Sequence, residues 1–255
     1  MSERLELSVI LPAYNESRVI EETLDRVDNA IRQTGLSYEI VVVDDGSVDD
    51  TKRRVVNYAS NNGHIKVVSY RRNIGKGHAV KTGFQRAKGN FVIFIDSDLD
   101  IDPQLIRRYF KALIQGDIVV GSKWHPQSHV EIPLVRRLLS LAFNILARLL
   151  TGVRLRDTQT GLKAVRKRAL KKVFSRLAVK RYAYDVELLA VANLYGLRIV
   201  EMPIDIHMDS LFDPKDVWRM FVDLLGIAYR LRFLRKRYLR TLEQPKQLKS
   251  KAVAD

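Results

Sequence analysis

The feature that most constrains this chain is an alternation, up to about residue 120, between short β-branched runs and longer polar segments with a helical period. This alternation is typical of βαβ units and a largely parallel sheet. It predicts strands at residues 5–11, 39–43, 65–69, 90–95 and 117–120. Helices are expected to begin near Glu16, Asp49, Gly77 and Asp102. The expected fold class is therefore α/β with a mostly parallel central sheet.

The length and composition fit this expectation. A chain of 255 residues accommodates one large α/β domain, and an apolar fraction of 46% suffices for a buried core. The absence of cysteine excludes disulfides and thiolate metal sites and suits a reducing compartment. The first apolar run, residues 5–11, is too short for a signal peptide, so no signal peptide and no export are expected.

The formal net charge of +15 requires an anionic partner, which could be nucleic acid, a membrane surface or a phosphorylated substrate. From residue 217 to the end, ten Lys or Arg residues stand against three acids and alternate with Leu, Phe, Tyr and Trp. This pattern favours a membrane surface with anionic lipids. No nucleic acid is expected, because a phosphate-binding surface has no use for acidic clusters at its centre. A basic nucleic-acid-binding protein is kept as the distant alternative.

Two amphipathic segments follow the alternating region. Residues 133–151 predict a helix whose charge-free stretch, residues 138–147, is too short to span a bilayer, which needs about 20 apolar residues. That helix is therefore either a core helix or one that lies in the membrane interface. We expect a catalytic domain over residues 1–212, an amphipathic basic helix over 213–242 and a disordered tail over 243–255. The protein is expected at the cytoplasmic face of the membrane, as a peripheral protein without a transmembrane helix.

Acidic residues follow two of the predicted strands, where open α/β sheets bind ligands. Asp44-Asp45-Gly46-Ser47 comes directly after an all-apolar strand. A carboxylate there can accept hydrogen bonds from a base or a ribose, and glycine allows a sharp turn into the next helix. The alternative is a simple turn in which Asp49 caps the helix.

The second acidic segment, Asp96-Ser97-Asp98-Leu99-Asp100, also follows an apolar strand. Alternation along an extended strand would point the three carboxylates, Asp96, Asp98 and Asp100, to one side. Like charges at one place are offset by a hard divalent cation, so these residues are predicted to bind Mg²⁺ or Mn²⁺ together with the phosphates of a nucleotide. A solvated turn that caps the next helix is the alternative.

A glycine-rich basic turn, Asn73-Ile74-Gly75-Lys76-Gly77, opens a predicted helix. The amide of Gly75 and the side chain of Lys76 could face a phosphate. The segment matches neither the Walker A spacing nor the dinucleotide fingerprint, so an ordinary turn remains the alternative.

Taken in order, these motifs resemble the family 2 glycosyltransferases. The resemblance rests on residues 9–16 (VILPAYNE), 44–47, 73–77 and 96–98. Residues 156–163 and 184–189 resemble the dolichyl-phosphate glucose and mannose synthases of that family, with the glucose branch closer. The resemblance implies an A-type glycosyltransferase (Rossmann-like nucleotide-binding) fold, an inverting mechanism and a polyprenyl phosphate acceptor.

The resemblance also implies roles for particular residues. Residues of the donor site would be Pro12, Tyr14 and Glu16 around the nucleoside, Asp44 or Asp45 at the base or ribose, and Asp96, Ser97 and Asp98 at the metal and diphosphate. Asp100 stands where the mannose synthases usually have glutamine. The acceptor phosphate would meet Lys123, where the family commonly has arginine, together with Arg136 and Arg156. Asp157 would orient a basic side chain or act as a base.

The expected activity is transfer of a hexose from a nucleotide-diphosphate sugar to dolichyl or polyprenyl phosphate. Glucose from UDP-glucose is favoured through the resemblance, and mannose from GDP-mannose is the alternative. A nucleotidyltransferase would share the sheet and the metal carboxylates. Its glycine-rich basic loop is missing, because residues 11–16 (LPAYNE) occupy that place.

Overall fold

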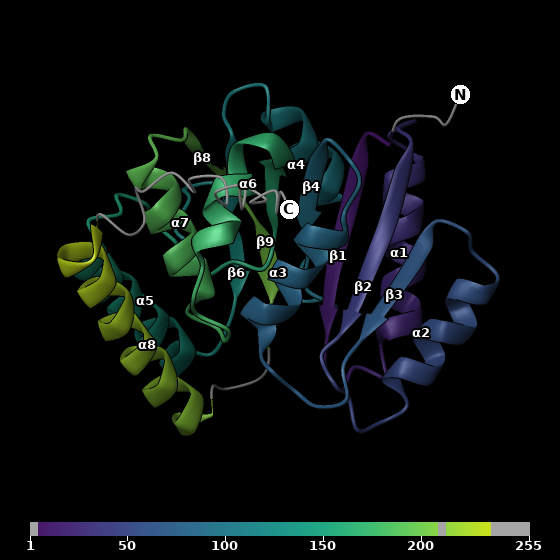
Figure 1. Cartoon of the computed structure of the whole chain (residues 1–255), viewed down its shortest axis with the longest axis horizontal. Coiled ribbons are helices and arrows are strands. Elements are labelled where there is room, and N and C mark those ends of the chain that lie inside the picture. The colour runs from purple at the N-terminus through teal and green to yellow at the C-terminus, as the bar shows by residue number, and fades with distance from the viewer. Residues whose placement is uncertain (1–4, 209–212, 236–255) are drawn as a thin grey trace, which may run out of the picture.

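The structure, a computed structural model, describes residues 5–208 and 213–235 and is built around a seven-stranded sheet (Figure 1). The strand order is β3-β2-β1-β4-β7-β5-β8, and β7 alone runs antiparallel to its neighbours. Its strands are β1 (Leu7–Ala13), β2 (Tyr38–Asp44), β3 (Ile65–Ser69), β4 (Phe91–Phe94), β5 (Ile118–Ser122), β7 (Lys163–Arg166) and β8 (Ile199–Pro203). Two further strands, β6 (His129–Glu131) and β9 (Asp205–His207), form a separate parallel pair.

Helices cover both faces of the sheet, and each face has its own apolar core. Buried residues of α1, α2 and α4 form one core, and those of α3, α6 and α7 form the other. The helices are α1 (Ile20–Arg32), α2 (Thr51–Ser60), α3 (Lys76–Arg86), α4 (Leu105–Ala112), α5 (Leu134–Thr151), α6 (Lys167–Arg176), α7 (Tyr184–Leu194) and α8 (Pro214–Phe233). Two-sided coverage explains why β1, β2 and β5 are almost wholly buried and lack an alternating pattern.

The strands predicted from the alternation are confirmed, with ends that shift by one or two residues. The predicted helices begin within four residues of the expected positions. The antiparallel strand β7, which lies between β4 and β5, was not predicted. Its pairing joins segments about 70 residues apart, so no local pattern indicates it.

Helices α5 and α8 lie side by side at one edge of the molecule (Figure 1). Between them and α7 is a small third core that contains Ala147, Leu224 and Ile227. Away from this core, both helices expose apolar side chains: Leu134, Val135, Leu138, Leu139, Leu141, Ile145, Leu149, Trp218, Val222, Leu225, Tyr229 and Phe233. We call these twelve residues the apolar face.

Helix α5 packs inward through a few residues and exposes the rest, which leaves both sequence alternatives for residues 133–151 open. In the part of the chain that the structure describes, no helix is long and apolar enough to cross a bilayer. The structure describes no residue after 235. The predicted continuation of the last helix to residue 242 and the predicted tail over 243–255 therefore lie outside the described residues.

Candidate functional site

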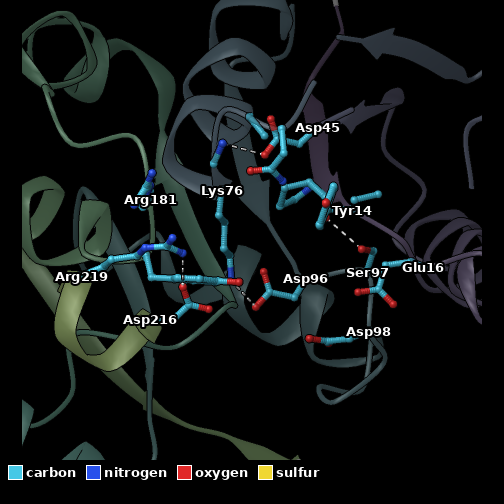
Figure 2. Close-up of a pocket in the computed structure, with 16 residues that line it drawn as sticks. Tyr14, Glu16, Asp45, Lys76, Asp96, Ser97, Asp98, Arg181, Asp216 and Arg219 are labelled. Carbon is cyan, nitrogen blue, oxygen red and sulfur yellow. Dashed lines mark hydrogen bonds and ion pairs between the residues drawn. The ribbon is translucent and has the colours of Figure 1, made fainter. Parts of the chain in front are cut away.

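The carboxyl ends of β1, β2 and β4 meet at one edge of the sheet, beside a cavity of about 500 Å³ (Figure 2). The cavity lies where an open parallel sheet binds nucleotides. Nine of the residues predicted for the donor site or the metal line it: Pro12, Tyr14, Glu16, Asp45, Gly75, Lys76, Asp96, Ser97 and Asp98. Segments far apart in the sequence thus converge as the strand ends predicted.

A second cavity of about 290 Å³ adjoins the first. The two share five lining residues: Lys76, Asp96, Asp98, Tyr182 and Asp216. The second cavity is further lined by Asp100, Lys123 and Arg136, and by the apolar residues Ile132, Met208 and Met220. The carboxylates of Asp96 and Asp98, which we call the acidic floor, thus line both a larger polar space and a smaller space that has two further basic side chains.

The three acidic residues after β4 are brought together by a bend. The prediction that an extended strand aligns them was wrong, because β4 ends at Phe94 and Leu99 has a φ of 63°. The amide of Asp100 donates to Asp98 Oδ1 at 3.1 Å. This turn makes Asp96 and Asp98 line both cavities, whereas Asp100 lines the second and not the first.

The carboxylate of Asp96 is fixed from two sides. Its Oδ2 lies 2.7 Å from Lys76 Nζ (Figure 2). On another side is Gly161, where an added Cβ would lie only 2.0 Å from Asp96 Oδ2. Only glycine at position 161 leaves room for the carboxylate in this place.

Burial and mutual repulsion disfavour the charged form of carboxylates at the acidic floor. Burial, followed by the charges of Asp96 and Asp100, raises the pKa of Asp98 to about 7. The pKa of Glu16 is raised by burial and then by Asp100 and Asp96. In the described residues, no three Asp, Glu or His side chains form a group arranged to hold a metal ion. The three-ligand set Asp96, Asp98 and Asp100 stays a prediction.

A divalent cation nevertheless fits the pair Asp96 and Asp98. Both carboxylates face both cavities, and Asp96 already has a cationic partner in Lys76. Carboxylate oxygens are ligands for hard cations, and Mg²⁺ typically takes one or two of them and completes its shell with phosphates and water. Asp96 and Asp98 are the residues that would hold such an ion, and Asp100 lies at the edge of the second cavity.

The two acidic residues at the carboxyl end of β2, Asp44 and Asp45, make different contacts. Asp45 lines the first cavity and accepts hydrogen bonds from the amides of Ile74 (3.0 Å) and Gly75 (2.8 Å), so it fixes the glycine-rich turn. Asp44 is buried, lines neither cavity, and accepts from the amide of Ser47 at 3.1 Å. Asp44 thus serves the turn, as the alternative interpretation of this motif expects. Asp45 lines the cavity, where it can contact a ligand.

The basic residue Lys123 forms a buried ion pair at the second cavity. Its Nζ lies 2.7 Å from Asp157 Oδ2, and its amide donates to the same oxygen at 3.0 Å. Asp157 Oδ1 accepts from the amide of Gln159 at 3.0 Å and from Asn144 Nδ2 at 3.4 Å. Burial by itself would raise the pKa of Asp157, but Lys123 and these hydrogen bonds outweigh it and lower the pKa. A carboxylate so engaged is suited to orienting Lys123 rather than to accepting a proton.

The other two predicted basic residues lie in different places. Arg136, in the first turn of α5, lines the second cavity and is close enough for the charge of Asp100 to act on it. Arg156 is exposed and lines neither cavity, and its backbone amide donates to Glu201 Oε1 at 2.8 Å. The structure does not bring Arg156 to the site, although the next residue, Asp157, is buried and pairs with Lys123.

Sequence reasoning missed four residues that line the first cavity: Arg181, Tyr182, Asp216 and Arg219. The first two precede α7 and the others belong to α8, where Arg219 Nη1 lies 3.2 Å from Asp216 Oδ1 (Figure 2). Neither segment carries a recognisable motif. The only signal was that residues 180–182 directly precede the motif at 184–189.

The fold and the paired cavities define the class of protein, a glycosyltransferase with the A-type fold. The chain belongs to the family "Glycosyl transferase family 2", whose model matches residues 8–174. Family membership decides against the nucleotidyltransferase and nucleic-acid-binding alternatives.

The curated relatives match most of this chain. The chain is 33% identical over 237 residues to dolichyl-phosphate beta-glucosyltransferase ALG5A of Trichomonas vaginalis, which covers 87% of this chain and 72% of that protein. It is 31% identical to the human dolichyl-phosphate beta-glucosyltransferase, covering 92% of this chain and 76% of the relative. Similarity to glycosyltransferase AglD of Haloferax volcanii is 32%, over 89% of this chain but 36% of that one.

A solved structure supports the fold. Glucosyl-3-phosphoglycerate synthase from Mycobacterium tuberculosis, in complex with Mn²⁺, UDP-glucose and phosphoglyceric acid, superposes with a TM-score of 0.67. The two chains are 21% identical, and the match covers 88% of this chain and 79% of the other.

Proposed function

We propose that this protein transfers glucose from UDP-glucose to dolichyl phosphate, or to a related polyprenyl phosphate, at a membrane surface. The names of the curated relatives, dolichyl-phosphate beta-glucosyltransferases from several organisms, support glucose as the sugar and a lipid phosphate as the acceptor. They do not favour mannose.

The observation that carries the proposal is the pair of adjoining cavities with a shared acidic floor. The larger one has room for a nucleotide sugar, and nine predicted donor-site residues line it. The smaller one offers the side chains of Lys123 and Arg136 and continues onto apolar residues next to α5 and α8. A phosphate in the second cavity would therefore meet the reactive carbon of a sugar held over Asp96 and Asp98.

The acceptor phosphate would need little activation. A phosphate monoester is mostly dianionic at neutral pH, because its second pKa is about 6. Lys123, held in place by Asp157, and Arg136 would bind and orient the phosphate oxygens. A phosphate oxygen would then form a bond to the anomeric carbon as the bond from that carbon to the diphosphate breaks. The electron pair leaves with the nucleoside diphosphate, and the configuration inverts.

The donor diphosphate would lie against the residues of the first cavity. The amide-rich turn that Asp45 holds in place would contact its oxygens. A Mg²⁺ or Mn²⁺ ion at Asp96 and Asp98, when bound, supplies positive charge that stabilises the departing diphosphate. Tyr14, which is 43% exposed, would pack on the nucleoside at the open side of the cavity.

The apolar face is the proposed membrane contact. It lies on α5 and α8, the same two helices that supply Arg136, Asp216 and Met220 to the second cavity. Arginines on these helices, including Arg137, Arg219 and Arg232, could approach anionic headgroups, where each contributes on the order of 1 kcal/mol. We propose a peripheral protein at the cytoplasmic face, where a chain without cysteine suits a reducing compartment.

Transfer of radiolabel to a short polyprenyl phosphate tests the activity directly. We expect an organic-extractable product from UDP-glucose and not from GDP-mannose, in the presence of Mg²⁺ or Mn²⁺. Chelation should remove the activity and either metal should restore it, because the diphosphate would otherwise meet an acidic floor. A product from GDP-mannose alone would overturn the sugar assignment, and full activity in chelator would overturn the metal assignment.

Liposome flotation tests the membrane contact. The double variant W218A/F233A should bind anionic liposomes at least about tenfold more weakly than the wild type, since burying one large apolar side chain is worth about 1.5–3 kcal/mol. These two side chains are 65% and 73% exposed, so the protein fold should tolerate their loss. The control is V48A/I114A, which removes two apolar side chains that are still more exposed and lie outside the apolar face. Equal binding of both double variants would contradict the proposed contact.

A further inference from the structure

One lysine at the acidic floor lines the second cavity together with two carboxylates. Lys76 Nζ is 2.7 Å from Asp96 Oδ2, and the two side chains are 24% and 16% exposed. Asp185, at the start of α7, lines the second cavity together with both of them. Burial alone would lower the pKa of Lys76, but the charges of Asp96 and then of Asp185 outweigh it and raise the pKa. Lys76 therefore interacts with both acids, although it pairs directly with one.

Asp185 is fixed from its buried side. Its Oδ1 lies 2.7 Å from Nζ of Lys163, whose side chain is fully buried and also donates to the carbonyl of Thr160. In the described part of the chain, Asp185 Oδ1 has no hydrogen bond of good geometry besides this ion pair. Lys163 and a side-chain hydrogen bond with Tyr184 thus hold Asp185 in place next to the cavity.

The mobile partner in this arrangement is Lys76. The Asp96 carboxylate occupies the space beside Gly161, where an added Cβ would lie 2.0 Å from its Oδ2. Lysine, by contrast, carries a compact point charge on a flexible four-carbon chain. A movement of Lys76 between the two acids needs side-chain rotations and no change in the backbone.

We propose that Lys76 is an exchangeable counter-ion, which neutralises Asp96 in the metal-free protein and moves to Asp185 when a divalent cation and a nucleoside diphosphate bind at the floor. Asp185 is then a positioning residue that receives the displaced ammonium group. The inference rests on the proposed function in that it assumes a divalent cation at Asp96 and Asp98. It adds that the protein carries its own substitute for that cation, which keeps the acidic floor folded without metal.

Mn²⁺ titration followed by electron paramagnetic resonance, with UDP present and no acceptor, tests this exchange without turnover. Lys76→Met should bind Mn²⁺ several-fold more tightly, since no ammonium group competes for Asp96. Asp185→Asn should bind it about tenfold more weakly, a typical effect of removing an outer-shell partner. In the Lys76→Met background, Asp185→Asn should change the affinity by less than about twofold, because it acts through Lys76. Lys52→Met removes the same charge from an exposed part of α2 and should match the wild type.

Two outcomes would overturn the exchange. One is an equal effect of Asp185→Asn in both backgrounds, which would show a through-space charge effect. The other is unchanged or weaker Mn²⁺ binding by Lys76→Met. Should Asp185→Asn fail to fold, a crystal structure of the wild type with Mn²⁺ and UDP decides: the proposal requires Lys76 Nζ at hydrogen-bond distance from Asp185 and not from Asp96. Absence of Mn²⁺ binding in every variant overturns the metal assignment as well, whereas a wrong sugar or acceptor leaves these results unaffected.

Discussion

Replacing Asp98 by alanine is expected to lower glucosyl transfer by at least about 10²–10³-fold, the size of effect seen when a group that stabilises transition-state charge is removed. Asp98 faces both cavities, so its loss affects the contact with the departing diphosphate directly. The fold should remain, and the free energy of unfolding should be unchanged or higher. The reason is that burial and the charges of Asp96 and Asp100 destabilise the Asp98 carboxylate in the folded protein.

Loss of transfer without loss of stability would show that Asp98 acts in the site and is not needed for the fold. Initial rates of transfer from UDP-glucose and urea unfolding curves would be measured on the same preparations. Asp102→Ala is the matched control: it removes an exposed carboxylate that pairs with Arg26 and lines neither of the two cavities. We expect the control to keep nearly full activity. Substantial turnover by a folded Asp98→Ala protein would remove Asp98 from the mechanism.

Replacing Asp157 by alanine is expected to lower both stability and activity. The change leaves the ammonium group of Lys123 buried without its partner, and breaking a buried ion pair in this way typically costs about 3–5 kcal/mol. The amide of Gln159 and the side chain of Asn144 lose an acceptor as well. Since Lys123 would no longer be oriented at the second cavity, the remaining folded protein should also transfer glucose poorly.

The pH dependence follows from the direction of the pKa shift. The folded-state pKa of Asp157 is below its ordinary value of 3.8, so its stabilisation is present above that value and is lost as pH falls through the folded pKa. The stability difference between wild type and Asp157→Ala should therefore be complete above roughly pH 5 and narrow below pH 3.8. Urea unfolding monitored by circular dichroism at several pH values measures this difference.

An exposed ion pair supplies the control for this prediction. Asp50 pairs with Arg53 at 2.8 Å on the surface, where such pairs are worth about 0–1 kcal/mol. Asp50→Ala should thus reduce stability far less than Asp157→Ala. The double variant K123M/D157A should recover part of the lost stability without recovering activity. A loss at Asp157 no larger than at Asp50, or full activity of the double variant, would contradict the orienting role.

Much of the fold was predictable because its information is local. The run of residues 40–43 is apolar throughout, which marks a strand covered on both faces, and β2 is buried along its whole length. The turn after it was predictable too, since Gly46 has a φ of 75° and a Cβ there would lie 2.3 Å from the backbone of Arg72. Strand β7 was not predictable, because only its partners β4 and β5 define its place and direction.

The candidate site was likewise predictable only in part. The sequence by itself determined which side chains follow the strand ends, and parallel pairing then brings Tyr14, Asp45 and Asp96 to one edge. Only the tertiary structure decided that Asp44 turns inward, that Arg156 points away, and that α8 contributes Asp216 to both cavities. It also decided the ion pairs that join Lys123 to Asp157 and Lys163 to Asp185. The physical reason is that strand ends are positioned by backbone pairing, which a short pattern specifies, whereas the partner of a charge depends on packing between segments distant in the chain.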